Sequence, residues 1–352
     1  MTQHSQPQPI AITLGDAAGI GPEIIAKAFC QEPELLGHCF VWGDVGALRR
    51  AIRLVKADGP ALPVALIQSP SEFPQIPPRC LGVLQAGEAL PELPWGKVSA
   101  QAGAFAGQCV VQAAEAALRG EVAAIVTAPL HKEALHAAGA PFDQFPGHTE
   151  MLQAAAARHV GKATHEVPVR MMLANDELRT VLVSIHVSLR QALAAVTFDN
   201  VLETLLITHE SLSRVLGRAP RIAVAGLNPH AGEGGLFGNE ELEIIAPAMR
   251  AAQERGCQVS GPWAPDTVFM RARKVPGKTG EFDVVVAMYH DQGLIPVKYL
   301  GVEKGVNVTL GLPLVRTSPD HGTAFDIAGK GCADSSSLIE AIRMAQRLIT
   351  VS

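Results

Sequence analysis

The chain has 352 residues, of which 48% are hydrophobic and 18% are charged, and its formal net charge is −5. Because a single hydrophobic core seldom grows beyond about 250–300 residues, we expect two domains. The negative net charge argues against nucleic acid and against an anionic membrane surface as partners. No apolar run approaches the roughly 18 residues of a membrane span, and the opening MTQHSQPQP lacks the basic and apolar regions of a secretory signal. We therefore expect a cytoplasmic protein.

Short apolar segments rich in β-branched residues alternate with helix-like segments along most of the chain. The expected strands cover residues 10–14, 40–43, 122–127, 167–174, 180–185, 221–227 and 284–288. The expected helices cover residues 22–30, 45–55, 100–119, 151–158, 201–216, 240–254 and 335–350. The strands at 167–174 and 180–185 should form a hairpin, and the proline-rich stretch 58–96 should hold edge strands and loops. Strands that alternate with helices predict a parallel, doubly wound α/β architecture.

The six cysteines are spread along the chain and form no C-x-x-C pair. This spacing argues against a zinc–thiolate centre and against a disulfide framework. It favours free thiols in a reducing compartment.

The first expected strand runs into the glycine-containing turn GDAAGIGPE at residues 15–23. A strand, a glycine turn and a helix start can cradle a phosphate. The segment matches neither the G-x-G-x-x-G nor the Walker A pattern, however, so a tight turn without a ligand is the simpler interpretation.

Three histidines each follow a buried strand: His186 after TVLVSI, His230 after IAVAGLNP and His290 after VVVAMY. If these strands are parallel in one sheet, the three imidazoles emerge at the same edge. Three imidazoles with an open fourth position make a catalytic site for zinc or a similar divalent ion, although a histidine taken singly is more often a core or surface residue. Asp266 and Asp291 could orient the ligands or transfer protons.

A second group of residues has the chemistry of an anion site. A cation or amide embedded in apolar sequence needs a partner or a ligand, because burying it alone is costly. The helix expected after PGHTE also begins with free N–H groups that favour anions. A phosphate or carboxylate would satisfy these groups, and so would buried ion pairs with Asp or Glu. The candidates are His148, Thr149, Lys298, Asn307 and Arg316.

For Thr149 and Lys132, an interpretation without a ligand is as simple as a role in binding. Thr149 could act as a helix N-cap, and Lys132 could be a solvated lysine at a helix start or a functional one.

The segment DHGTAFDIAGKG at residues 320–331 has glycines that permit close backbone approach to a ligand. Asp326 within it is suited to accept hydrogen bonds from ribose hydroxyls. Because an acid at this position would repel a 2′-phosphate, it predicts NAD rather than NADP.

These motifs resemble the 4-hydroxythreonine-4-phosphate dehydrogenase family of pyridoxal phosphate biosynthesis, over nearly the whole chain. The similarity lies in GDAAGIGPEI (15–24), TAPLHK (127–132), PGHTE (146–150), LNPHAGEGG (227–235), APDT (264–267), MYHDQGLIPVKY (288–299) and GVNVTLGLPLVRTSPDHGTAFDIAGKG (305–331). The last segment is also similar to the adenosine-binding loop of isocitrate and isopropylmalate dehydrogenases.

The resemblance implies an isocitrate/isopropylmalate dehydrogenase-like fold of two α/β/α domains with a cleft between them. We place the first, discontinuous domain at residues 1–135 plus 305–352. The second, at residues 136–304, would carry the metal ligands and the dimer contacts. The resemblance further implies a homodimer in which both protomers contribute to each active site.

The implied reaction is oxidation of the C3 hydroxyl of 4-phosphooxy-L-threonine by NAD, followed by decarboxylation to 3-amino-2-oxopropyl phosphate. The divalent metal would be Zn²⁺, with Mg²⁺ or Co²⁺ as alternatives. By motif, the metal ligands would be His186, His230 and His290, and the substrate-binding residues would be His148, Thr149, Lys298, Asn307 and Arg316. The cofactor-binding residues would be His321, Gly322, Asp326 and Gly329. The candidates for the general base are Asp266, Asp291 and Lys132.

Ala18 replaces a proline that is usual in the first motif of the family. That motif and SPDHGTAFDIAG also resemble a sister branch that acts on 4-phospho-D-threonate or 4-phospho-D-erythronate in sugar-acid catabolism. An alternative of a different class is a phosphate-dependent acyltransferase or a phosphometabolite-binding protein, because related α/β folds host acyl transfer.

Overall fold

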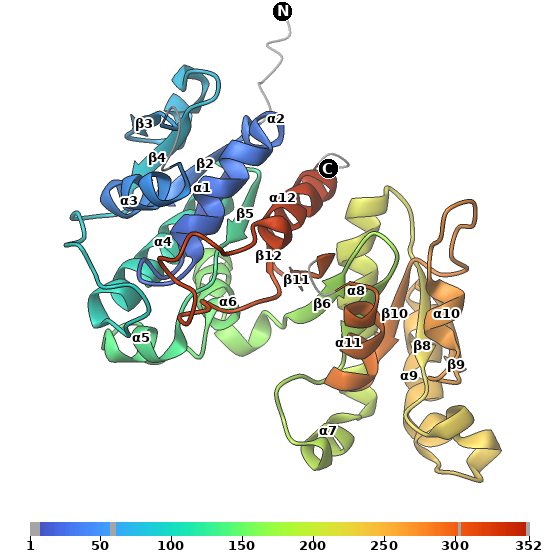
Figure 1. Ribbon diagram of the computed structural model, residues 1–352. Coiled ribbons are helices and arrows are strands. Elements are labelled where there is room, and N and C mark those ends of the chain that lie inside the picture. The colour runs from blue at the N-terminus through green and yellow to red at the C-terminus, as the bar shows by residue number, and fades with distance from the viewer. Residues whose placement is uncertain (1–7, 57–60, 302–303, 350–352) are drawn as a thin grey trace, which may run out of the picture. The chain divides into compact units, whose positions relative to one another are not determined.

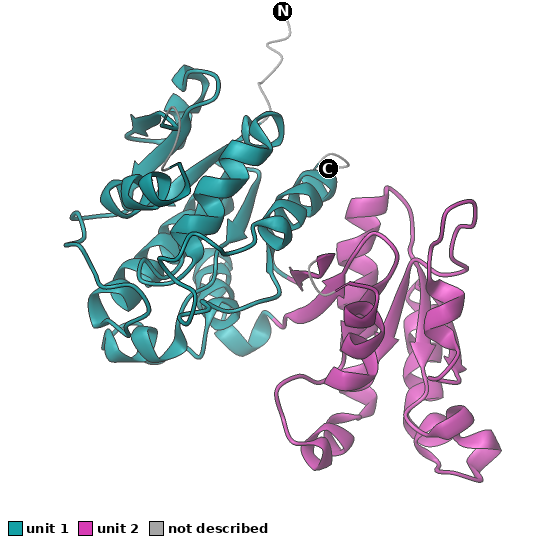
Figure 2. Ribbon diagram, viewed as in Figure 1, with its two compact units in different colours: residues 1–167, 312–349 teal, residues 168–311, 350–352 magenta. Residues whose placement is uncertain are grey.

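The computed structural model describes residues 8–56, 61–301 and 304–349. These residues form two compact units (Figure 2). Unit 1 takes the described residues up to 167 together with 312–349, and unit 2 takes 168–311. Each unit is a twisted sheet with helices on both faces, as Figure 1 shows, so the predicted α/β/α class is confirmed for each unit.

Unit 1 is built on six strands in the order β3-β4-β2-β1-β5-β12, and every neighbouring pair is parallel. Its strands are β1 (Ile10–Thr13), β2 (Cys39–Gly43), β3 (Val64–Ile67), β4 (Leu81–Gln85), β5 (Ala124–Thr127) and β12 (Val315–Pro319). Its helices are α1 (Gly21–Gln31), α2 (Pro33–Leu36), α3 (Val45–Val55), α4 (Ala100–Leu118), α5 (Lys132–Ala137), α6 (His148–Val160) and α12 (Ser336–Ile349). Two 3₁₀ turns, η1 (Pro70–Gln75) and η2 (Thr164–Glu166), complete it.

Two helix layers cover this sheet. Helices α1, α3 and α12 pack together on one face, and α4, α5 and α6 pack together on the other. All residues of β1, β2 and β5 are buried, which is typical of parallel strands covered on both sides. Because the strands are parallel, their carboxyl ends share one edge, where ligands bind in open α/β sheets.

Unit 2 has the strand order β11-β6-β7-β10-β8-β9. Strand β6 (Arg170–Ala174) is antiparallel to both β11 (Val306–Leu310) and β7 (Arg179–Leu182). The remaining neighbours, β7, β10 (Val284–Ala287), β8 (Arg221–Ala225) and β9 (Gln258–Trp263), are parallel. The hairpin predicted at 167–185 is therefore confirmed as β6–β7. Its turn is fixed by Asn175, whose Oδ1 accepts the Glu177 and Leu178 N–H groups at 2.9 and 2.8 Å.

The helices of unit 2 are α7 (Leu189–Ala195), α8 (Phe198–Leu216), α9 (Ala246–Glu254), α10 (Val268–Ala272) and α11 (His290–Tyr299). A 3₁₀ segment, η3 (Pro229–Gly235), follows β8, and one π-helical turn, η4 (Glu241–Ile245), precedes α9. The helix expected at 240–254 thus begins as a π turn, a feature often found at functional sites. Among the described residues, no helix is long and apolar enough to cross a bilayer.

The grouping into units differs from the predicted domain boundaries at 135/136 and 304/305. Helix α6 belongs to unit 1 because it packs on α4, and β11 belongs to unit 2 because it pairs with β6. The boundaries between the units therefore lie at 167/168 and 311/312. A sequence motif does not indicate which element its helix or strand packs against.

The contact between α4 and α5 depends on one residue without a side chain. A Cβ atom at Gly103 would lie 1.9 Å from the Ala134 carbonyl oxygen, which belongs to the backbone and cannot rotate away. We predict that Gly103→Ala lowers the free energy of unfolding by about 2 kcal/mol or more, because the two helices must separate. Urea denaturation followed by circular dichroism measures this change.

The exposed Gln101 on the same helix supplies the control. Gln101→Ala should change the free energy of unfolding by no more than about 0.5 kcal/mol. A Gly103→Ala protein as stable as the wild type would contradict the packing described for α4 and α5.

Candidate active site

Arg316 is the second residue of β12, and its side chain reaches the carboxyl end of the neighbouring strand β5. Its residue is only 4% exposed, and its Nε and Nη2 atoms donate hydrogen bonds of 3.1 and 2.7 Å to the hydroxyl of Thr127 at the end of β5. Burial lowers the pKa of Arg316 to about 10, and the charge of Glu150 acts in the opposite direction. The guanidinium therefore stays charged at neutral pH, inside the fold and beside a strand end.

His148 begins α6 close to this guanidinium. Its Nε2 atom is buried and has no hydrogen-bond partner. Burial lowers the pKa of His148 well below its usual value, and the positive charges of Arg316 and Lys132 lower it further, against a backbone hydrogen bond with Ala128. The imidazole is therefore neutral near pH 7, with one ring nitrogen available to a ligand.

The first turn of α6 adds backbone donors. The N-cap is Gly147, and no side chain caps the helix, so Thr149 lies in the first turn and is not the N-cap. A Cβ atom built on Gly147 would lie 4.0 Å from the Lys132 Cε atom, which places that lysine beside the helix start. A guanidinium, an ammonium, a neutral imidazole and uncapped N–H groups together form a site for an oxyanion. We call Arg316, His148, Thr149 and Lys132 the oxyanion site.

Asp16, in the turn between β1 and α1, was not singled out from the sequence. Its side chain is fully buried, Oδ1 accepts the Ala18 N–H group at 2.8 Å, and Oδ2 has no partner. Burial raises the pKa of Asp16, while the Ala18 hydrogen bond and the nearby His131 lower it. The turn before it is tight, because Gly15 has φ +70° and a Cβ atom there would lie 2.3 Å from the Pro129 oxygen. The geometry of residues 15–18 thus agrees with the interpretation as a tight turn.

The segment 320–331 forms the loop that follows β12 in unit 1. It is joined to the β1–α1 turn by a hydrogen bond of 3.1 Å from the Ile20 N–H group to the Thr323 oxygen. Gly329, with φ +76°, lies against the Trp95 ring, where a Cβ atom would come within 2.4 Å. His321, Gly322 and Asp326 are exposed. The loop therefore presents the exposed Asp326 carboxylate above a packed base, and its role in binding adenosine stays a prediction.

The three predicted metal ligands follow three neighbouring parallel strands of unit 2. His186 lies beyond β7, His290 begins α11 after β10, and His230 lies in η3 after β8. The condition for that prediction, parallel strands in one sheet, is therefore met. The rings of His186 and His290 are 5.6 Å apart, centroid to centroid. Both residues help to line a pocket of about 410 Å³, within the size range of small-molecule sites.

Two of these histidines have an unusual backbone. His186 and His230 have φ values of +50° and +53°, in the left-handed region that costs a residue with a Cβ atom free energy. Such strain is retained mainly where the side chain must point in one direction.

Two polar side chains, the buried Glu241 and the half-buried Gln292, hold the loops that carry these residues. The Glu241 Oε1 atom, in η4, accepts the N–H groups of Leu227 and Asn228, both at 2.7 Å. Gln292 accepts the Met288 N–H group at 2.7 Å and donates to the Gly226 oxygen at 2.8 Å. It therefore joins the ends of β10 and β8. Neither residue was predicted from the sequence, because an acid and an amide on helices also match solvated surface positions.

Imidazole nitrogens, the donors that the three histidines offer, are suitable ligands for a divalent metal ion. The Nδ1 atom of His290 forms a 2.6 Å hydrogen bond with Asp291 Oδ1, the type of contact that orients a metal-ligating imidazole and leaves Nε2 for the ion. In the described parts of the chain, however, no three His, Cys, Asp or Glu side chains already lie close enough to hold an ion. The metal site stays a prediction.

The remaining predicted residues of unit 2 divide between its two ends. We call the carboxyl edge of β7, β10 and β8, after which the three histidines lie, the histidine edge. Asp266 is exposed in the loop after β9, the parallel neighbour of β8, and thus at the histidine edge. Lys298 is in the last turn of α11, about 12 Å along the helix from His290 at 1.5 Å per residue. Asn307 pairs with Leu173, which pairs with Thr180 near the start of β7. Within unit 2, Lys298 and Asn307 therefore lie away from the three histidines.

The charge of Arg316 can be tested through the pKa of His148. Arg316→Gln removes a positive charge next to the imidazole, so we predict that the pKa of His148 rises, as measured by nuclear magnetic resonance of the ring. Because the pKa in the folded protein lies below the unfolded value of about 6.5, His148 also reduces stability as the pH falls below that value.

Arg119→Gln is the control, because Arg119 lies in the same unit but pairs with Glu121 on the surface. It should leave the pKa of His148 unchanged. An unchanged or lower pKa in Arg316→Gln would show that the two side chains do not interact.

Comparison with known proteins agrees with this geometry. The family described as "Pyridoxal phosphate biosynthetic protein PdxA" matches residues 36–345. The 4-hydroxythreonine-4-phosphate dehydrogenase of Beijerinckia indica subsp. indica is 52% identical over 342 residues, which cover 97% of this chain and 95% of that protein. The D-threonate 4-phosphate dehydrogenase of Salmonella typhimurium is 46% identical over 340 residues, covering 96% and 98%.

Among solved structures, 4-hydroxythreonine-4-phosphate dehydrogenase from Klebsiella pneumoniae has a TM-score of 0.85 and 42% identity, and the match covers 99% of each chain. The family match at residues 36–345 extends over both units and spans the positions of the oxyanion site and of the three histidines. The chain therefore belongs to the PdxA family of pyridoxal phosphate biosynthetic proteins, which are dehydrogenases.

Proposed function

We propose that this protein oxidises the C3 hydroxyl of 4-phosphooxy-L-threonine with NAD, and that the resulting 3-oxo acid loses carbon dioxide to give 3-amino-2-oxopropyl phosphate. The observation that carries the proposal is the buried Arg316 with its neighbour His148, which form a site for the phosphate of a small substrate. The names of relatives that are 52% and 42% identical support this substrate.

The phosphate would be held by charge and by backbone donors together. Arg316 is fixed by its hydrogen bonds to Thr127, and its guanidinium would attract the phosphate through a charge-assisted hydrogen bond. His148 contributes its unpartnered ring nitrogen, and the uncapped N–H groups around Thr149 add the positive end of the α6 dipole. Fixing the phosphate holds the C3 hydrogen in one orientation for transfer to the nicotinamide.

His186, His230 and His290 would hold a divalent ion, with Zn²⁺ as the first candidate because three imidazoles and an open position suit it. Such an ion polarises a hydroxyl oxygen and stabilises the negative charge that develops when carbon dioxide leaves. Lys298 and Asn307 would contribute to substrate binding, and this assignment rests on the family motif alone.

NAD would be bound by the 320–331 loop, with the exposed Asp326 on the ribose hydroxyls and His321, Gly322 and Gly329 shaping the adenosine site. The packing of Gly329 on Trp95 supports a loop that is preformed for a ligand.

Among the three candidates for the general base we favour Asp266. Asp291 is engaged with His290 Nδ1, which suits an orienting role. Lys132 lies beside α6 and suits phosphate binding. Asp266 is exposed in the loop after β9, and its carboxylate has no hydrogen bond or ion pair with another described residue.

A homodimer with shared active sites is part of this proposal. Large apolar side chains are exposed close to the histidines, namely Val187 (49%), Leu189 (61%), Leu236 (72%) and Phe237 (49%). Exposed apolar side chains that gather in one region favour an interface. A cytoplasmic location is supported by the cysteines, all six of which are free.

A second substrate class is supported by a specific observation, the 46% identity to a D-threonate 4-phosphate dehydrogenase. The corresponding alternative is oxidation of 4-phospho-D-threonate or 4-phospho-D-erythronate by the same groups. A phosphate-dependent acyltransferase or a non-catalytic phosphometabolite-binding protein is the alternative of a different class.

Formation of NADH, followed by its absorbance, tests the proposal with purified protein, NAD and added Zn²⁺. We expect turnover of 4-phosphooxy-L-threonine to exceed that of the two sugar-acid phosphates, and a chelator to abolish it. A preference for a sugar-acid phosphate would replace the substrate, and no NADH with any of the three would contradict the dehydrogenase assignment.

Arg316→Gln should lower kcat/KM by about 10- to 100-fold, because one charge-assisted hydrogen bond contributes about 1.5–3 kcal/mol. His230→Ala should abolish turnover. Arg119→Gln, on the surface of unit 1, should retain wild-type kinetics, and equal kinetics of all three variants would contradict the assigned roles.

A further inference from the structure

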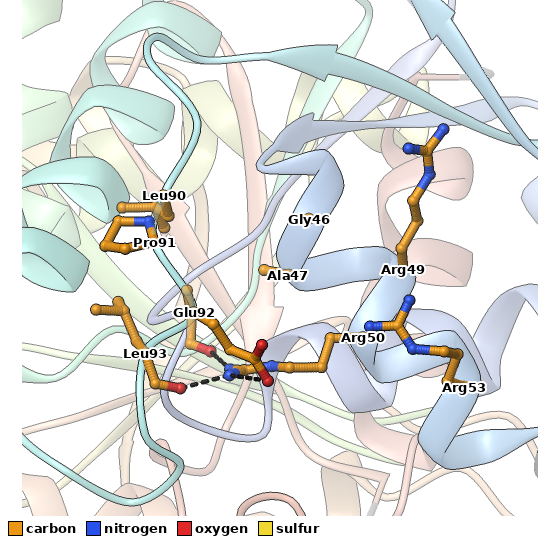
Figure 3. A pocket seen from close by; sticks show the side chains of 10 residues that line it. Gly46, Ala47, Arg49, Arg50, Arg53, Leu90, Pro91, Glu92 and Leu93 are labelled. Carbon is orange, nitrogen blue, oxygen red and sulfur yellow. Dashed lines mark hydrogen bonds and ion pairs between the residues drawn. The ribbon is translucent and has the colours of Figure 1, made fainter.

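A second basic pocket lies in unit 1, formed by segments that follow three neighbouring strands. Ala17 comes after β1, Ala47 lies in the first turn of α3 after β2, and residues 90–93 follow β4. Figure 3 shows this pocket, with the side chains of Arg49, Arg50 and Arg53 all leaving α3. We call these three residues the arginine triad.

The positive charge of the triad is only partly offset. Arg49 and Arg53 are one helical turn apart, a spacing at which like charges destabilise a helix. Neither has a hydrogen bond or ion pair with the described residues. Glu92 is 81% exposed at its side chain and approaches Arg50 only to 3.9 Å. The second acid nearby, Asp44, is occupied as an acceptor for Ala47, Gln85 and Leu90.

Arg50 is held rigidly at the base of the pocket. Its guanidinium lies 3.8 Å from the centroid of the Trp95 ring, donates to the Leu93 oxygen, and contacts the Ala17 oxygen at 3.4 Å. Its Nε atom is buried and has no acceptor. Burial lowers the pKa of Arg50 and the charge of Arg53 adds to this effect, against Glu92 and Asp44. An anion in the pocket would reduce the repulsion between the arginines and could accept a hydrogen bond from the Arg50 Nε atom.

The size of the pocket restricts the ligand. Its volume of about 220 Å³ is below the roughly 300–1,000 Å³ of sites that enclose a drug-sized molecule. We propose that the arginine triad binds a small, multiply charged oxyanion of the phosphate class, separate from the oxyanion site at Arg316. Planar guanidinium groups match phosphate oxygens in geometry as well as charge.

Two sources could supply this phosphate. Trp95 touches both Arg50 and Gly329, so the pocket is next to the 320–331 loop, and the ligand could be the diphosphate of a dinucleotide. It could also be a separate phosphorylated metabolite. The proposal does not depend on the proposed dehydrogenase activity, because binding is measured without substrate or turnover.

Calorimetric titration of the full-length protein with inorganic pyrophosphate is the test. We expect saturable binding that weakens as the salt concentration rises. The double variant Arg49→Gln/Arg53→Gln should weaken it by about tenfold or more, since two charged donors are lost. Arg250→Gln, an exposed arginine on α9, is the matched control and should bind as the wild type does.

Glu92→Gln removes the acid that faces the triad, so binding should tighten by about two- to fivefold. A gain of affinity cannot arise from misfolding. Competition between pyrophosphate and NAD would identify the dinucleotide as the source, and simultaneous binding would identify a separate ligand; each supports the site. Absence of saturable binding to the wild type, or equal affinity in the double variant and the control, would overturn the proposal.

Discussion

The hydrogen bonds from Arg316 to Thr127 are the interaction on which the site of unit 1 depends. A guanidinium that is almost fully buried costs several kcal/mol unless its donors are satisfied, and the hydroxyl of Thr127 satisfies two of them. The pairing of β12 with β5 sets Arg316 beside Ile125, and from there its side chain reaches Thr127 at the carboxyl end of β5. The parallel sheet therefore creates a fixed positive charge where the strands stop. That charge in turn helps to keep His148 neutral and makes the start of α6 a place for an anion.

Unit 2 depends on a different constraint, which is backbone strain held by polar side chains. His186 and His230 are in the left-handed region, at a cost of the order of 1–3 kcal/mol each. Glu241 and Gln292 fix the neighbouring loops through backbone hydrogen bonds. Strain of this kind persists only where the surroundings determine the conformation, so the histidine edge is a rigid framework for its side chains. The two units thus provide complementary chemistry, an anion site in one and imidazoles in the other.

Much of this arrangement was predictable from the sequence, because the carboxyl ends of parallel strands lie at one edge of their sheet. A buried β-branched run that ends in a polar residue places that residue at the carboxyl edge, and this rule was sufficient for His186, His230 and His290. Arg316 was predicted in a different way, as a cation embedded in apolar sequence. For residues that do not follow a strand end, the predicted position in the site was less precise. Lys298 follows His290 by eight residues on one helix, so its motif is continuous in sequence while its side chain is a helix length away.

Other features had no signal in the sequence. Trp95 becomes important only because Gly329 and Arg50 reach it from distant parts of the chain. The arginines of α3 match the polar face of an ordinary amphipathic helix, and only the return of residues 90–93 over them forms a pocket. The packing of α6 on α4, which moved the unit boundary, is likewise a tertiary preference. Contacts between distant segments are therefore what the sequence pattern could not supply.

The central claim is that the oxyanion site selects a phosphorylated substrate. The most direct test compares NADH formation from 4-phosphooxy-L-threonine with that from unphosphorylated 4-hydroxythreonine, in the wild type and in Arg316→Gln. The account predicts that the wild type prefers the phosphorylated compound by about 1,000-fold or more in kcat/KM, since several charge-assisted contacts are lost together without the phosphate. In Arg316→Gln this preference should shrink by at least about tenfold. Equal turnover of the two compounds by the wild type, or an unchanged preference in the variant, would contradict it.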